Sequence, residues 1–140
     1  MSEPSQRLVF LKDLPQPFFL KELPLTAADA PPIDLGHLAR MSLGKRHLEC
    51  EVLELFDRQA EMILGCVQEA GPVRVASIAR MLAGSARGIG AWRVAEAAEA
   101  LERAAVENRR LALALTSLET AVVEARLAIC AMLRIHLSSP

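Results

Sequence analysis

The chain has 140 residues, of which 52% are apolar and 4% aromatic, and its net charge is −1. This length suits one domain with its own core, and the scarcity of aromatic residues favours an all-α fold over a sheet. The balanced charge argues against a nucleic-acid partner, no apolar run reaches the ~20 residues that span a bilayer, and the N-terminus lacks a secretory signal, so we expect a cytoplasmic protein without a membrane partner.

The first 32 residues differ in composition from the rest and contain six of the eight prolines. Each proline fixes its own φ and biases the preceding residue away from helix, so we expect an extended arm. Its apolar stretches, LVFL at 8–11 and PFFL at 17–20, can lie against the domain or a partner, and a mobile tail is the alternative. We therefore divide the chain into a Pro-rich arm, 1–32, and a helical domain, 33–140.

The helical domain begins with a short helix and a longer one. Asp34 can cap the short helix, and Gly44 can end it. The second helix occupies about 45–70 and ends at Gly71-Pro72, where the sequence breaks the helical pattern. Its expected inward residues follow helical spacing: Leu48, Val52, Leu55, Phe56, Gln59, Ile63 and Cys66.

Three more helices follow. The third is expected from Val73 to 85–87, and Gly88-Ile89-Gly90 forms a tight turn in which Gly88 takes the left-handed conformation. The fourth, 91–105, then runs antiparallel to the third because the connection is so short. The inward residues of the last helix, 109–136, alternate steps of four and three: Leu111, Leu115, Leu118, Val122, Ala125, Ile129 and Met132.

This pattern predicts an antiparallel four-helix bundle preceded by a short helix and the arm. An alternative for the last helix is a coiled-coil seam with a second copy of the chain, so a homodimer stays open. Trp92, just after the turn, is expected to close that end of the bundle.

Gly84 needs a separate explanation because it lies inside the third helix. A glycine there usually allows another backbone or a partner to come close. By helical register we place Arg80, Ala83, Gly84 and Arg87 on one exposed face, which is flat at its centre and flanked by arginines. We take these four residues as the candidate partner-binding site.

The stretch RMLAGSARGIGAWRVAEAAEALE, 80–102, resembles the signature of histidine-containing phosphotransfer (HPt) domains, and the resemblance covers about Ile33 to the C-terminus. Eight positions agree with the family pattern: Leu82, Gly84, Ser85, Ala86, Gly90, Ala91, Leu101 and Glu102. The resemblance implies a four-helix bundle in which an exposed histidine exchanges a phosphoryl group with an aspartate of a receiver domain. A lysine one turn later faces the phosphoryl oxygens, and the glycine leaves room for the receiver.

The chain departs from this pattern at both reactive positions. Arg80 stands at the phosphoacceptor position and Ala83 at the lysine position. A guanidinium stays protonated and has no lone pair for nucleophilic attack, so it cannot replace the imidazole. The resemblance therefore implies an HPt-like domain that does not itself carry phosphate.

The remaining histidines and cysteines give little indication of a catalytic or metal-binding site. His37, His47 and His136 lack a glycine one turn later, and we do not expect any of them to substitute for the missing histidine. The three cysteines, Cys50, Cys66 and Cys130, have no metal-ligand spacing and are expected to be buried apolar residues. We therefore expect no metal, no cofactor and no enzyme activity.

Three functions remain open. The first is a phosphorelay module of two-component signal transduction that binds a response-regulator receiver domain or a histidine kinase without phosphate transfer. The second is an active phosphocarrier, and the third is a structural or dimerising helical bundle. We favour the first because Gly84 and the helical pattern are retained while the reactive residues are absent.

Overall fold

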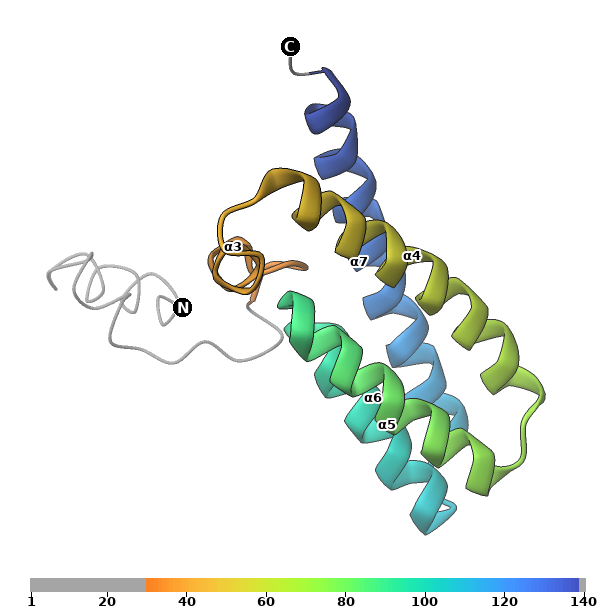
Figure 1. Cartoon of the computed structure of the whole chain (residues 1–140). Coiled ribbons are helices and arrows are strands. Elements are labelled where there is room, and N and C mark those ends of the chain that lie inside the picture. Colours follow the sequence, from red (N-terminus) through yellow and green to blue (C-terminus); the bar gives the residue numbers. More distant parts are fainter. Residues whose placement is uncertain (1–29, 139–140) are drawn as a thin grey trace, which may run out of the picture.

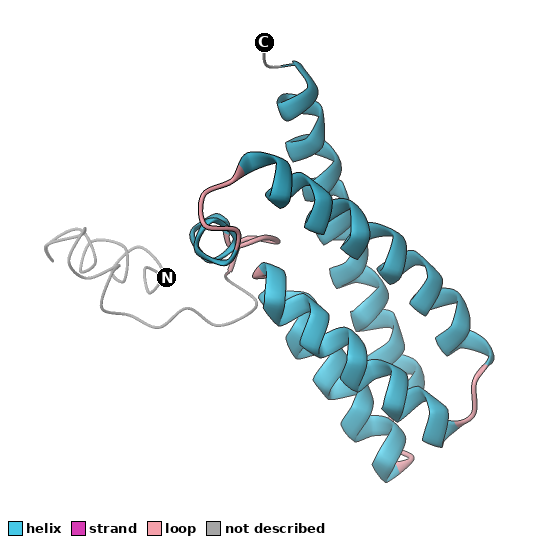
Figure 2. Ribbon diagram, in the orientation of Figure 1, coloured by secondary structure: helices cyan, strands magenta, loops and turns pink. Residues whose placement is uncertain are grey.

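The structure is a computed structural model that describes residues 30–138. Within this range the regular secondary structure is entirely helical (Figures 1 and 2). The helices are α3 (Leu35–Met41), α4 (Arg46–Glu69), α5 (Pro72–Ile89), α6 (Trp92–Glu107) and α7 (Leu111–Ser138). The prediction of an all-α fold is confirmed, whereas the predicted arm falls almost entirely at 1–29, outside the described residues.

The four longer helices form a closed cycle of contacts. Helix α4 packs against α5 and α7, and α6 packs against the same two helices. The short α3 packs against α5, near the end where α5 meets α6 (Figure 1). The core therefore lies between α4, α5, α6 and α7, and α3 covers one end of it.

Alanine is frequent among the buried residues of α5 and α6, which pack against each other. Ala79, Ala83 and Ala86 of α5 are buried, as are Ala95 and Ala98 of α6. Small side chains allow two helix axes to come close together. The larger core side chains occupy the remaining interior: Leu38, Leu53, Leu82, Val94, Leu101, Leu118, Val122 and Ile129 are almost fully buried.

The buried face of α4 differs from the predicted one. Leu55 is 60% exposed and Cys66 is also exposed. The buried residues are instead Leu53, Phe56, Ala60, Ile63 and Val67. These follow alternating steps of three and four, and they form the stripe that a helix buries when it packs between two neighbours. The prediction was wrong at Leu55 and Cys66 because apolar residues also lie on the exposed side of α4.

The turn between α5 and α6 also lies further along the chain than predicted. Helix α5 continues through Gly88 to Ile89, whose side chain is buried. Gly90 is the residue in the left-handed conformation, with φ +81°, and its N–H group bonds to α5 carbonyls. Burial of Ile89 against the core keeps this last turn helical, so Gly88 is a helix-interior residue and not the cap.

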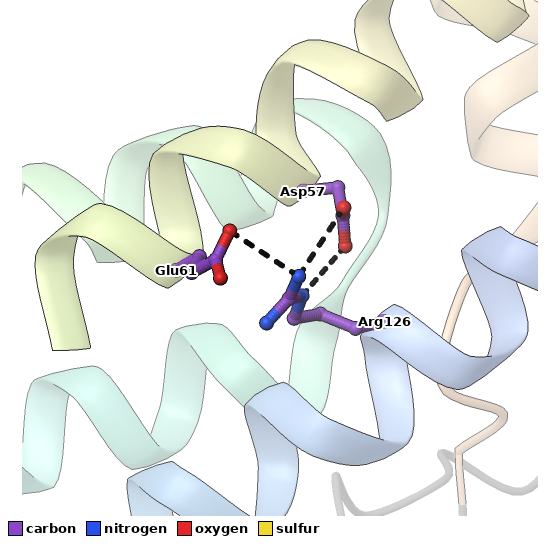
Figure 3. A network of polar contacts seen from close by, with 3 residues as sticks. All are labelled: Asp57, Glu61 and Arg126. Carbon is purple, nitrogen blue, oxygen red and sulfur yellow. Dashed lines mark hydrogen bonds and ion pairs between the residues drawn. The ribbon is translucent and has the colours of Figure 1, made fainter. Parts of the chain in front are cut away.

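Polar side chains join α7 to α4 across the outer part of their contact. The Nε atom of Arg126 donates a hydrogen bond to Oδ1 of Asp57 at 2.7 Å, and its Nη2 atom lies 3.6 Å from Oε1 of Glu61. Figure 3 shows the arginine of α7 pointing toward both carboxylates of α4. Near the C-terminal end of α4, the side-chain amide of Gln68 donates a hydrogen bond to Glu119 of α7 at 2.8 Å.

Candidate functional site

The predicted partner-binding residues lie on α5, but they do not all share its outer face. Arg80, Gly84 and Arg87 are exposed, and the Arg80 side chain is 81% exposed. Ala83 is only 2% exposed and belongs to the core. The prediction that Ala83 belongs to the exposed surface was therefore wrong. Position 83, three residues from both Arg80 and Ala86, lies on the side of α5 that packs against α6.

Both arginines of this face form ion pairs with α6. The Nε atom of Arg80 donates to Oε2 of Glu102 at 3.1 Å. Arg87 pairs with Glu99. Residue numbers rise along α5 as they fall along α6, which shows that the two helices run antiparallel. The face thus presents paired charges of both signs rather than the two free positive charges that the sequence suggested.

Gly84 lies between these two arginines on α5, and the space outside it is open. A Cβ atom added to Gly84 would meet no described atom within 4 Å. Glycine in a helix interior costs about 1 kcal/mol relative to alanine. Packing among the described residues gives no reason for glycine here, so this position is free for an approaching surface.

Asp34 joins the start of α3 to the α5–α6 turn. Its backbone N–H donates to the Gly90 carbonyl at 2.9 Å. Its carboxylate accepts from the His37 backbone N–H at 3.1 Å through Oδ1 and from Trp92 Nε1 at 2.9 Å through Oδ2. The hydrogen bond from Trp92, followed by that from His37, lowers the pKa of Asp34 below its ordinary value of 3.8.

The parts of this junction can be predicted from the sequence, but their connection cannot. Asp34 was expected to cap the short helix and Trp92 to close the turn, but nothing indicated that they bond to each other. The His37 ring also packs edge-on against Trp92, with 4.9 Å between ring centroids. Asp34 lies nearly 60 residues before Gly90 and Trp92 in the sequence. No local pattern therefore indicates that these residues are in contact.

The described histidine and cysteine side chains do not gather at the α5 face. His37 lies in α3 beside Trp92, and His47 is exposed in the first turn of α4. Among the described residues no group of histidine, cysteine or acidic side chains is arranged to hold a metal ion. Cys66 and Cys130 are exposed and Cys50 is half-buried, so the expectation of buried cysteines was wrong.

The described helices and the comparisons with known proteins give two further findings. None of the helices between residues 30 and 138 has both the length and the apolar character needed to cross a membrane. Comparisons with protein-family models, with curated proteins and with solved structures return no match for this sequence. The resemblance to HPt domains therefore rests on the sequence pattern alone.

Proposed function

We propose that this chain is an HPt-like signalling module that binds a receiver or kinase domain on the outer face of α5 without carrying phosphate. The observation that carries this proposal is Gly84, a glycine in a helix interior with open space above it. It lies one turn after the exposed Arg80, at the position where the resembling family keeps a glycine for its receiver.

The side chains around Gly84 favour docking over phosphoryl transfer. Arg80 offers only hydrogen-bond donors, and one of them is already given to Glu102. No histidine lies on the described outer face of α5, and the His37 ring is packed against Trp92. An active phosphocarrier would need an accessible neutral imidazole.

The helix arrangement agrees with this proposal. We take the closed cycle of α4, α5, α6 and α7 as the antiparallel four-helix bundle of an HPt-like domain, with α3 as its N-terminal helix. The docking face would then lie on the α5–α6 hairpin, whose two helices are also linked there by the Arg80–Glu102 and Arg87–Glu99 ion pairs.

The proposal is tested by titrating the protein with isolated receiver domains, followed by incubation with the phosphorylated form of any that binds. We expect at least one receiver to bind and no acid-labile phosphate to appear on this chain. Stoichiometric phosphohistidine would instead establish an active phosphocarrier. Failure of every receiver and kinase domain of the source genome to bind would reject the docking function.

The exposed side of α7 supports a second candidate, a dimerising bundle. Leu113, Val123 and Leu127 are more than half exposed there, and Leu113 and Leu127 lie two heptads apart. The three charged residues between positions 111 and 133, Glu119, Glu124 and Arg126, are engaged with α4 or α6. The outward side is therefore uncharged over this range, and it combines these apolar residues with the exposed hydroxyls of Thr116, Ser117 and Thr120.

Sedimentation of the parent and of Leu127→Glu distinguishes this candidate. A parent dimer that the variant converts to monomer would support a dimerising bundle. A monomeric parent at about 100 μM would reject it, since a surface that buries a stable interface associates well below that concentration.

A further inference from the structure

An apolar groove of about 260 Å³ opens between α3, α4 and α5. It is lined by Leu38, Met41, Ser42, Leu48, Val52, Gly88 and Ile89. An apolar cavity of ~150 Å³ is enough to hold a benzene ring, so this groove has room for an aromatic side chain. The Ser42 hydroxyl is already bonded to the Ala39 carbonyl and to Glu49, which leaves the groove without a polar group to satisfy.

The side chains that line the groove do not fill it. Met41 is 59% exposed at its rim. A Cβ atom added to Gly88 would meet no described atom within 4 Å. Gly88 thus resembles Gly84 one turn earlier: both are helix-interior glycines that leave space beside α5.

The chain itself carries apolar segments a short way before α3 in sequence. Three of its four phenylalanines, Phe10, Phe18 and Phe19, precede the described residues. The described chain begins at Ala30, which is buried and lies five residues before α3, itself one wall of the groove. The ten Cα-to-Cα steps from Leu20 to Ala30 can span up to ~36 Å, longer than α5 at ~27 Å.

We propose that the segment 17–20, PFFL, binds in this groove and places a phenylalanine ring beside Met41, Val52 and Gly88. A short tether gives such a segment a millimolar effective concentration, so modest apolar contact is enough for binding. The segment LVFL at 8–11 closes a longer loop and is the less favoured occupant. The inference does not depend on receiver binding, although the occupied groove borders the face around Gly84.

The test uses the full chain labelled with ¹³C at its methionine methyl groups. There are five methionines, and Met41→Leu assigns the resonance at the groove. In the parent we expect a ring-current shift of the Met41 methyl that is lost in Phe18→Ser/Phe19→Ser and kept in the control Phe10→Ser. Gly88→Leu, which fills the groove, should also remove it.

The Met62 and Met132 resonances, from α4 and α7 away from the groove, should stay unchanged in both arm variants. An identical Met41 resonance in the parent and in Phe18→Ser/Phe19→Ser would overturn the proposal. A Met41 shift that varies with protein concentration would also overturn it, because the occupant would then be a second copy of the chain.

Discussion

Gly88 and Gly90 lie two residues apart but differ in backbone conformation and in the space available for a side chain. Gly90 has φ +81°, and a Cβ atom there would come within 3.0 Å of the Asp34 backbone. We expect Gly90→Ala to destabilise the fold by about 2 kcal/mol, from the strained φ and the displaced Asp34. Gly88→Ala is the matched control and should stabilise by up to ~1 kcal/mol. Urea unfolding measures both, and a Gly90→Ala variant as stable as the parent would contradict the assignment of Gly90 as the helix cap.

The Asp34–Trp92 hydrogen bond predicts a dependence of stability on pH. The folded-state pKa of Asp34 is lowered, so its contribution is complete above the ordinary value of 3.8 and is lost as pH falls through the lower folded value. Trp92→Phe removes the largest cause of that shift and should cost about 1 kcal/mol at pH 7. The difference between parent and variant should shrink below about pH 4, measured by unfolding followed with circular dichroism. A difference that stays constant down to pH 2 would show that Trp92 acts through packing alone.

At the scale of helices, the spacing of apolar residues predicted where helices occur better than it predicted which face of each helix is buried. The five helices of the described chain lie where the pattern of apolar residues, Asp34 and Gly71-Pro72 put them. The buried stripe of α4 was misplaced because its sequence carries apolar residues such as Leu55 and Met62 on the exposed side as well. The end of α5 was misplaced because burial of Ile89, a tertiary effect, outweighs the low helix propensity of Gly88.

The contact between α4 and α7 predicts a stability effect of its own. Arg126 bonds to Asp57 and lies near Glu61, and both Arg126 and Asp57 are about one-third exposed. We expect Arg126→Ala to destabilise by about 1 kcal/mol, because solvent screens part of this pair. The exposed Arg58 of α4 provides the control, since Arg58→Ala should stay within about 0.5 kcal/mol of the parent. Equal unfolding midpoints for the two variants would mean that the Arg126 pair adds nothing to stability.

For the whole molecule, the sequence identified the helix that carries the candidate site but not its surroundings. Arg80, Gly84 and Arg87 were placed on one face by register, and they are exposed there. Ala83 was placed with them, yet it is buried because α6 packs closely on that side of α5. The ion pairs to Glu99 and Glu102 depend on the alignment of α5 with α6, which no local spacing specifies.

The ion pairs change the expected role of Arg80 in docking. Because Glu102 offsets its charge, Arg80→Ala should weaken receiver binding only about threefold, with a small change in salt dependence. Titrations at 50 and 500 mM salt measure this effect. Loss of binding by more than about a hundredfold would show instead that Arg80 is a central contact of the interface.

The measurement that tests the docking face most directly compares Gly84→Gln with Gly65→Gln. Both glycines are exposed in helix interiors with open space at the Cβ position, but Gly65 lies on α4. Each change should raise stability by several tenths of a kcal/mol, because glutamine is the better helix former. In titration against a receiver domain that binds the parent, we predict that Gly84→Gln weakens binding at least tenfold, about 1.4 kcal/mol, while Gly65→Gln binds as the parent does. Parent-like affinity in Gly84→Gln would contradict a docking face centred on Gly84.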